Sequence, residues 1–266
     1  GARDAGQAVA WLRRAADAGR ADAQALLAEH LAAGLGVARD LTEALRLFAA
    51  AANAGEPAAM TGLARLLLAG PEATWAEGAR WAHKAAGAGH TPGMVLLAGT
   101  LTKGRGVRRS TRNAISYLRR AAERGDGDAV LRLAHLFDDL GRSQAARELS
   151  KALADKGDAR AMLLLTRLHV SRRAPSTAAE AVRWANLLVE RGDPEALLFV
   201  ARRGAEADAQ VTLALLRRAA EAGLPGAMVD LARRLEASEP AAARGWLERA
   251  AALGETEARL LLAAGR

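Results

Sequence analysis

The sequence has no cysteine, seven prolines and few aromatic residues. Without cysteine the chain can form no disulfide, no thiolate metal site and no cysteine nucleophile. Aromatic residues make up only 3% of the chain, so the hydrophobic fraction of 51% is mostly alanine and leucine, which favour closely packed helices. Because no run of alternating β-branched residues indicates a sheet either, the composition predicts an all-α protein.

Long apolar stretches are also missing. No segment of about 18 uncharged apolar residues occurs, so we expect no membrane span in this sequence. No signal peptide is visible at the start, and residues 257–266 look like the first helix of a repeat without its partner helix. We therefore expect both ends to be cut from a longer array.

The charge is unbalanced towards the basic side, with 38 Lys and Arg against 30 Asp and Glu and a formal net charge of +8. Such an excess can attract an acidic protein, an anionic polymer or nucleic acid. It can also reflect an arginine-rich composition, and the interspersed acidic residues favour that interpretation. Nucleic acid is not expected as a partner, because exposed aromatic residues interleaved with the basic ones are missing.

The most regular feature is a glycine that recurs after similar apolar stretches, at intervals of 31 to 36 residues. The eight positions are Gly19, Gly55, Gly89, Gly125, Gly157, Gly192, Gly223 and Gly254. This spacing is typical of stacked helix pairs and predicts a single array of about eight repeats over residues 1–266. In each repeat the glycine ends one helix, helix B, in a left-handed cap, and the next helix, helix A, follows.

Fixed positions around the glycine predict the core of each repeat. Eight residues before it stands a large residue, which we place on the buried face of helix B. Four of the five tryptophans occupy this column: Trp11, Trp81, Trp184 and Trp246. After the glycine, helix A carries mostly alanine at the fourth and ninth positions and leucine or valine at the eighth. These columns predict close packing between successive A helices.

Two repeats share a distinctive connection between their helices. Residues 34–40 and 104–110 each begin with Gly-x-Gly-Val, and the first copy ends its helix B with Ala51, Ala52 and Gly55. Together with the alanine and leucine columns, this pattern resembles Sel1-like repeats, relatives of the tetratricopeptide repeat, over essentially the whole chain. The resemblance implies a right-handed superhelical solenoid of antiparallel helix pairs.

The same resemblance implies a kind of function. Sel1-like proteins look like adaptors and scaffolds that assemble other proteins, in bacteria often at the cell envelope. A subset resembles periplasmic scaffolds of exopolysaccharide export, including alginate secretion. The resemblance therefore favours the bacterial periplasm or cell envelope over the cytoplasm.

Patterns for catalysis or cofactor binding are missing. The five histidines do not pair with carboxylates or with one another at metal-ligand spacing. No phosphate-binding glycine loop and no serine nucleophile elbow is present. We therefore predict no catalytic, metal or cofactor site, and a protein that is not an enzyme.

Several basic residues stand ten residues after the recurring glycine. If the A helices line the concave side of the array, this column forms a ladder that can hold carboxylates in bidentate pairs. The alternative is a solvated polar face. The predicted partner-binding residues of the ladder and its neighbours are Arg65, His135, Arg167, Arg202, Arg203, Arg233 and Arg234. Trp75 lies outside the repeat register and either packs under a short loop or anchors a partner.

From these features we predict a non-catalytic interaction scaffold that binds another protein, one with an acidic surface, along the concave helix-A groove. The alternative is a bacterial cell-envelope component of alginate-like exopolysaccharide biosynthesis or secretion. Such a component would scaffold the export complex or guide the anionic polysaccharide itself. The two alternatives share a cationic surface and differ in the ligand that it holds.

Overall fold

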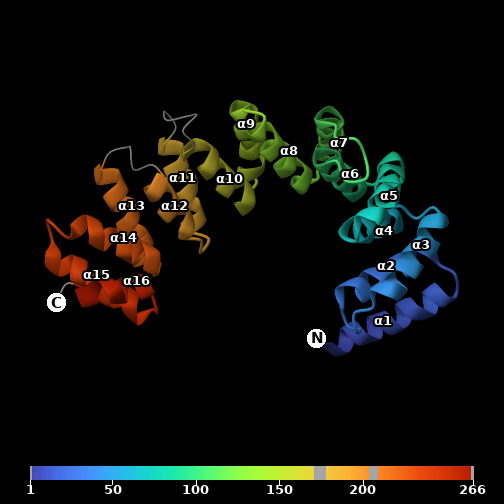
Figure 1. Ribbon diagram of the computed structural model, residues 1–266, viewed down its shortest axis with the longest axis horizontal. Helices are drawn as coiled ribbons and strands as arrows, with labels where there is room; N and C mark the ends of the chain where they lie inside the picture. Colours follow the sequence, from blue (N-terminus) through green and yellow to red (C-terminus); the bar gives the residue numbers. More distant parts are fainter. Residues whose placement is uncertain (1, 171–177, 204–208, 265–266) are drawn as a thin grey trace. The chain divides into compact units, whose positions relative to one another are not determined.

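Helices make up nearly all of the structure, a computed structural model that describes residues 2–170, 178–203 and 209–264 (Figure 1). Over these ranges the chain forms sixteen α-helices and one short 3₁₀ helix, η1 (Glu72–Thr74), and no strand. The helices pack in sequential pairs, in a solenoid-like repeat arrangement. The prediction of an all-α repeat fold is confirmed.

Two kinds of helix alternate along the chain. The B helices are α1 (Ala2–Asp17), α3 (Leu41–Asn53), α5 (Trp75–Gly87), α7 (Thr111–Glu123), α9 (Ser143–Ala154), α11 (Ala178–Val189), α13 (Ala209–Glu221) and α15 (Pro240–Ala252). The A helices are α2 (Ala21–Ala33), α4 (Pro57–Ala69), α6 (Thr91–Lys103), α8 (Gly127–Asp139), α10 (Ala159–Val170), α12 (Glu195–Arg203), α14 (Pro225–Leu235) and α16 (Thr256–Ala264). Each B helix and the A helix after it are joined by a short link that contains the recurring glycine.

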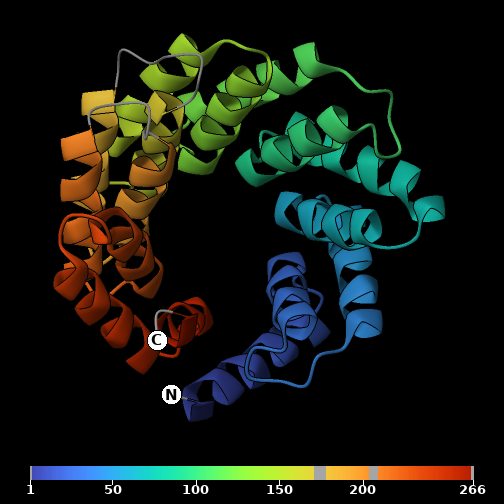
Figure 2. The ribbon, with the colours of Figure 1, turned by 60° about the vertical axis from the view of Figure 1, so that its left-hand side comes forward.

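The chain divides into two compact units, unit 1 (Gly1–Leu133) and unit 2 (Ala134–Arg266), and α8 crosses the boundary. Consecutive helices pack together from α1 to α7 in unit 1 and from α9 to α16 in unit 2. A helices of adjacent repeats also touch directly, in the pairs α2–α4, α4–α6 and α10–α12. Figure 2 shows the chain of unit 1 turning back at the end of each helix. A single unbroken array over both units stays a prediction.

The recurring glycine ends every helix B as the sequence predicts. All eight glycines have a positive φ, from 82° at Gly89 to 97° at Gly55, a conformation that a side chain would strain. The N–H of Gly55 donates to the carbonyl of Ala52, and the next N–H, of Glu56, donates to the carbonyl of Ala51 at 3.0 Å. This left-handed cap satisfies the last carbonyls of the helix and directs the chain into helix A.

The predicted core columns of helix A are also confirmed. The fourth residue after the glycine is buried in every repeat, from Ala23 to Ala258. The eighth, from Leu27 to Leu231, is buried in seven repeats and half-buried only at Leu262 in α16. Small residues beside these leucines let adjacent A helices approach closely.

The expected burial of the helix-B tryptophans is wrong for three of the four. Trp184 is buried, but Trp81 and Trp246 are only half-buried, and Trp11 is 67% exposed. In α3 the buried face includes Ala44, Phe48 and Ala51, which stand eleven, seven and four residues before the glycine. The column eight residues before the glycine is therefore buried in some repeats, as at Leu47 and Leu215, and leaves a ring partly in water in others.

Each of the three tryptophans of this column that are not fully buried has a basic residue three positions later in the sequence. Arg14 lies 5.0 Å from the ring centre of Trp11, and Lys84 lies 4.0 Å from that of Trp81. These distances allow cation–π attraction, which is compatible with solvent on the other side of the ring. The tryptophan column therefore belongs to the surface of helix B in these repeats.

Candidate functional site

A groove lies over the A helices of unit 1 and has a volume of about 440 Å³. It is bounded by α4, α6, the first turns of α8 and the Gly-x-Gly loop that follows α6. Its floor is formed by Leu68, Pro92, Val95, Leu96 and Gly99, and its charged rim by Arg65, Lys103, Arg105, Asp128 and Arg132. We call this surface the unit 1 groove.

The floor of the groove is apolar even where it contains hydroxyl groups. Thr61 and Thr100 line it, but both side chains are buried and donate to carbonyls of their own helices. Thr61 Oγ1 donates to the Pro57 carbonyl at 3.0 Å, and Thr100 Oγ1 donates to the Leu96 carbonyl at 2.8 Å. Because these hydroxyl hydrogens are already used, the floor offers a ligand mainly hydrocarbon contact.

The rim carries four cations and one carboxylate. Within the described ranges, Arg65, Lys103 and Arg132 take part in no ion pair with this chain, and all three are exposed. Arg105 lies over the Trp75 ring at 5.1 Å from its centre. The groove is therefore a cationic surface with free guanidinium and ammonium groups around an apolar floor, which suits an acidic ligand.

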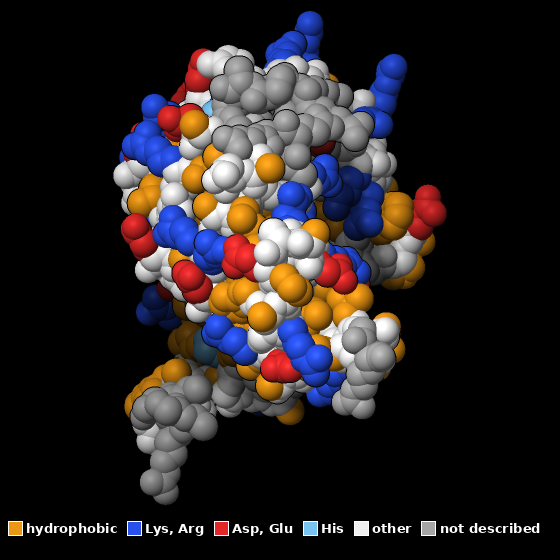
Figure 3. Space-filling model, turned by 90° about the vertical axis from the view of Figure 1, so that its left-hand side faces the viewer, with side chains coloured by type: hydrophobic (Ala, Val, Ile, Leu, Met, Phe, Trp, Pro, Cys, Tyr) orange, Lys and Arg blue, Asp and Glu red, His pale blue; other side chains and the backbone are white. Residues whose placement is uncertain are grey.

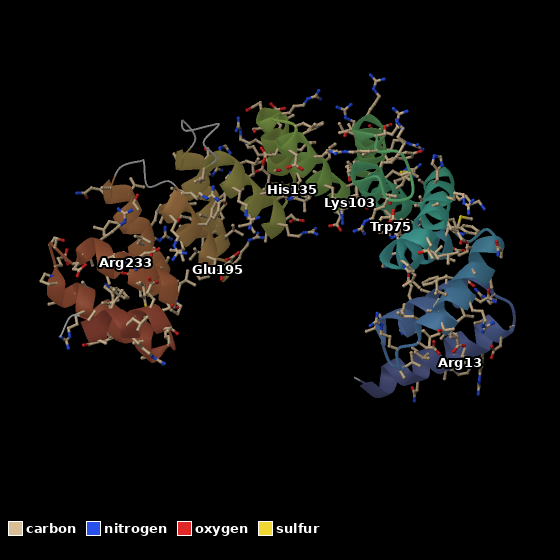
Figure 4. The ribbon with its side chains drawn as sticks, viewed as in Figure 1. Arg13, Trp75, Lys103, His135, Glu195 and Arg233 are labelled. Carbon is tan, nitrogen blue, oxygen red and sulfur yellow. The ribbon has the colours of Figure 1, made fainter. Side chains whose placement is uncertain are left out.

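Trp75 lies beside the groove, in contact with the Gly-x-Gly loop that bounds it. It opens α5 directly after η1, and its indole N–H donates to the Gly70 carbonyl at 3.0 Å. The Gly-x-Gly loop packs on its backbone so closely that a Cβ at Gly106 would lie 2.2 Å from the Trp75 carbonyl oxygen. Figure 4 shows Trp75 and Lys103 on the same side of unit 1. Of the two predicted roles for Trp75, packing against loops is the one seen, and anchoring a partner stays a prediction.

His90 sits beside the groove and adds no permanent charge to it. Its Nδ1 lies 2.8 Å from Thr61 Oγ1, so it ties the start of α6 to α4. Burial lowers the pKa of His90 below its usual value, and Arg65 nearby lowers it further, while the carboxylates of Glu56 and Glu29 oppose the shift. The ring is therefore neutral near pH 7.

Two arginines of the predicted ladder in unit 2 form ion pairs with acidic residues of this chain, unlike Arg65 in unit 1. Arg202 Nε donates to Asp230 Oδ2 at 2.6 Å, and this hydrogen bond raises the pKa of Arg202. Arg233 donates to Glu257 in the same way. Both arginines thus link an A helix to the A helix of the next repeat. Figure 3 shows blue and red side chains interleaved on one face of the molecule.

Some of the remaining ladder residues contact an aromatic ring or line a hollow, and one is exposed to solvent. Arg167 and Arg203 lie 5.9 and 5.7 Å from the centre of the same ring, that of Phe199. Arg234 lines a hollow together with Arg202 and Arg233, whereas His135 is exposed on the part of α8 that belongs to unit 2. The structure therefore brings the unit 2 arginines together, while Arg65 lies in unit 1. That these residues bind a partner stays a prediction.

The two ladder arginines that form ion pairs follow one spacing across repeats, whereas Arg167, with Glu195 at the corresponding third position, lies over the Phe199 ring. The residue ten positions after one glycine faces the third and seventh positions after the next glycine, as Arg202 does with Asp230 and Arg233 with Glu257. Opposite Arg65 these two positions are Pro92 and Leu96. Arg65 is the ladder arginine with no acidic residue at either position, a signal that comparison of the columns across repeats would have found.

Sequence reasoning missed three of the four rim cations. Lys103, Arg105 and Arg132 stand in other columns than the ladder, so a search along one column does not collect them. Gly99, by contrast, is a ladder position without a side chain. The groove depends on that gap and on residues from three successive repeats.

Other kinds of site are not seen in the described part of the chain. The residues searched contain no group of three His, Cys, Asp or Glu side chains placed to hold a metal ion. Among the described helices, none combines the length and the apolar character that a membrane crossing requires. The unit 1 groove, with its apolar floor and cationic rim, is the candidate ligand site of unit 1.

Alternating helices, left-handed glycine caps and buried alanine columns define this chain as a helical repeat protein. More specifically, it belongs to the Sel1 repeat family, whose description, "Sel1 repeat", matches residues 1–19, 21–56, 91–126, 194–224 and 228–255, more than half of the chain. Sel1 repeat proteins are typically binding scaffolds and are generally non-catalytic. No curated protein matches the sequence significantly.

Solved structures with similarity to this chain come from bacteria. A Sel1 repeat protein from Oxalobacter formigenes is 27% identical, with a TM-score of 0.58, over 70% of this chain and 79% of that one. A protective antigen of uropathogenic Escherichia coli with an SLR fold is 22% identical over 98% of this chain and 68% of its own, with a TM-score of 0.46. An immunity protein from Pseudomonas aeruginosa is 20% identical over 68% and 72% of the two chains, with a TM-score of 0.48.

Proposed function

We propose that this protein is a non-catalytic scaffold that captures an acidic segment of a partner protein in the unit 1 groove. The observation that carries the proposal is the set of unpaired cations, Arg65, Lys103 and Arg132, around an apolar floor. Membership of a family of binding scaffolds supports a protein partner. The sequence analysis proposed a binding surface along the whole arginine ladder, and the present proposal places the binding site in the unit 1 groove alone.

The unit 2 arginines are weaker candidates for the same role. Arg202 and Arg233 already hold Asp230 and Glu257, so a partner's carboxylate must displace a carboxylate of this chain. The new ion pair would then contribute about as much free energy as the broken one, about 0–1 kcal/mol for an exposed pair, so the net gain is small. A carboxylate that binds Arg65 or Arg132 breaks no such pair.

The expected affinity is modest and depends on salt. Each exposed pair between a rim cation and a carboxylate should contribute about 0.2–1 kcal/mol, so several together are needed for binding. Screening over a Debye length of about 8 Å at physiological ionic strength should weaken this contribution steeply as salt is added. Contact with the apolar floor should persist at high salt.

A charge-reversal experiment tests this proposal. The double variant Arg65→Glu, Arg132→Glu removes two unpaired rim cations, and Arg80→Glu, Arg112→Glu changes the net charge equally at exposed positions outside the groove. The probe is fluorescein-labelled poly-L-glutamate, followed by fluorescence anisotropy with the full chain. We expect the groove variant to raise the Kd at least tenfold and the control to change it less than twofold.

The outcomes separate the proposal from simple charge attraction. An equal loss in both double variants would mean that net charge alone binds the probe, which contradicts a role for the groove. Absence of binding to the unaltered protein at low salt would also contradict it.

Alginate is the probe for the exopolysaccharide alternative, since a polyuronate also presents carboxylates to the rim. A polyuronate has no apolar side chains for the floor formed by Leu68, Val95 and Leu96, so we expect an acidic polypeptide that also contains leucine to bind more tightly at 150 mM salt. Tighter binding of alginate, lost in the groove variant, would favour the second function.

A further inference from the structure

The hollow at Gly99 has no explanation in the packing of the fold. Glycine in the middle of a helix is unfavourable relative to alanine, so its presence in α6 needs a reason. Apart from the two adjacent residues and the backbone of its own helix, a Cβ at Gly99 would meet no atom within 4 Å. The protein therefore has room for a side chain there and does not use it.

Three other glycines inside the helices of unit 1 are different, because their neighbours leave no room for a Cβ, whereas Gly87, the last residue of α5, is as open as Gly99. A Cβ at Gly62 would lie 2.3 Å from the Phe48 ring, one at Gly78 2.9 Å from Leu68, and one at Gly93 2.7 Å from Ala85. These three glycines allow close packing between helices. Gly99 instead widens the floor of a surface groove.

We infer that the Gly99 hollow selects partner segments in which a bulky apolar side chain stands between carboxylates. This inference rests on the proposed function of the same groove and specifies its ligand. Leu68, Val95 and Leu96 surround the hollow with hydrocarbon, and Thr61 and Thr100 present no free hydroxyl hydrogen. A leucine or phenylalanine side chain buried there should raise affinity about tenfold or more.

The charges define what must flank that apolar side chain. Arg65 stands on α4 and Arg132 on α8, while Gly99 stands on α6 between them, so cations lie to either side of the hollow. Adjacent helices are about 8–10 Å apart, and an extended peptide advances about 3.3 Å per residue. Carboxylates two to three residues before and after the apolar residue therefore match the rim.

Two peptides test the inference on the full-length chain. One is Ser-Glu-Glu-Ser-Leu-Ser-Glu-Glu-Ser, and the other has serine in place of the central leucine, so the two carry the same charge. We expect the leucine peptide to bind the unaltered protein at least tenfold more tightly in isothermal titration calorimetry at 150 mM salt. Gly99→Leu fills the hollow and should bring the two Kd values to within twofold of each other, with the Kd of the serine peptide unchanged within twofold.

Matched variants keep this result interpretable. Gly245→Leu places the same side chain at another open helical glycine, on α15, and should keep the tenfold preference. Gly99→Ala should reduce the preference by an intermediate amount. Thermal unfolding should show that both Gly99 variants are at least as stable as the unaltered protein, because each removes a helical glycine.

The failures are distinguishable. If both peptides bind equally well and the Arg65→Glu, Arg132→Glu variant loses both, the groove captures acidic segments but the Gly99 hollow selects nothing. If Gly99→Leu keeps the full preference, the apolar side chain sits elsewhere and the inference is wrong. If neither peptide binds, the proposed function fails with it.

Discussion

Substitution of Gly106 by alanine tests how closely the Gly-x-Gly loop packs against Trp75, because the added Cβ should lower the free energy of unfolding. Gly106 has a φ of 66°, and its Cβ would lie 2.2 Å from the Trp75 carbonyl oxygen and 2.5 Å from the Ala76 nitrogen. Left-handed backbone costs a non-glycine residue about 1–2 kcal/mol, and overpacking against backbone adds about 1–3 kcal/mol. We expect Gly106→Ala to lower the free energy of unfolding by about 2–5 kcal/mol in total.

Gly104 provides the matched control, because it has nearly the same backbone and none of the crowding. Its φ is 72°, and its Cβ would approach nothing closer than the Arg109 Cβ at 3.6 Å. Gly104→Ala should therefore cost only the backbone strain, about 1–2 kcal/mol. Urea unfolding followed by circular dichroism measures both variants, with the slope checked for two-state behaviour. Equal losses at the two positions would refute the argument that the loop packs on Trp75.

Three further predictions test the packing, the ion pairs and the half-buried His90. Ala64→Leu should lower the free energy of unfolding by about 1–3 kcal/mol, because the added side chain overpacks a buried position. Ala263→Leu lies in the same column but at an exposed position, so it should cost under about 0.5 kcal/mol. Similar losses for the two variants in urea unfolding would contradict the packing of the alanine column. Arg202→Ala should cost no more than about 1 kcal/mol because its pair with Asp230 is exposed, and a loss of several kcal/mol would show that the pair holds the repeats together. Because the folded state lowers the pKa of His90, the unfolded chain binds the proton more readily, so stability should fall as pH drops below about 6.5. His90→Gln should make this fall shallower in pH-dependent melts, and an unchanged slope would assign it to other groups.

The helix ends were predictable because glycine alone adopts the required conformation without strain. A glycine that follows the same apolar stretch in each repeat, such as Gly55, therefore marks the end of helix B. The alanine columns were predictable for a similar reason, since only small residues fit where Ala59 and Ala64 face the next helix. Local chemistry determines both features.

The tryptophan column was not predictable from periodicity, because a position at the edge of a helical face can be buried or wet. Trp184 is covered and Trp11 is not, although both occupy the same place in the repeat. Which outcome occurs depends on the neighbouring helices, and one repeat does not contain that information.

The groove escaped the sequence analysis because it is built across repeats and around a missing side chain. Arg65 was found as a ladder residue, but its lack of an acidic partner depends on Pro92 and Leu96 in the next repeat. Arg202 and Arg233 of unit 2 looked equivalent to it in sequence, and their carboxylate partners make them different. Column comparison between successive repeats is the sequence operation that separates the two cases.

Photo-crosslinking tests the central claim most directly, because it locates the ligand on the chain. The probe is the acidic nonapeptide with benzoylphenylalanine in place of its central leucine, irradiated with the full-length protein and mapped by mass spectrometry. The account predicts adducts on the groove floor, at Val95, Leu96 or Leu68, and their loss in Arg65→Glu, Arg132→Glu. Adducts confined to α12–α16, or a yield that the charge reversal leaves unchanged, would contradict it.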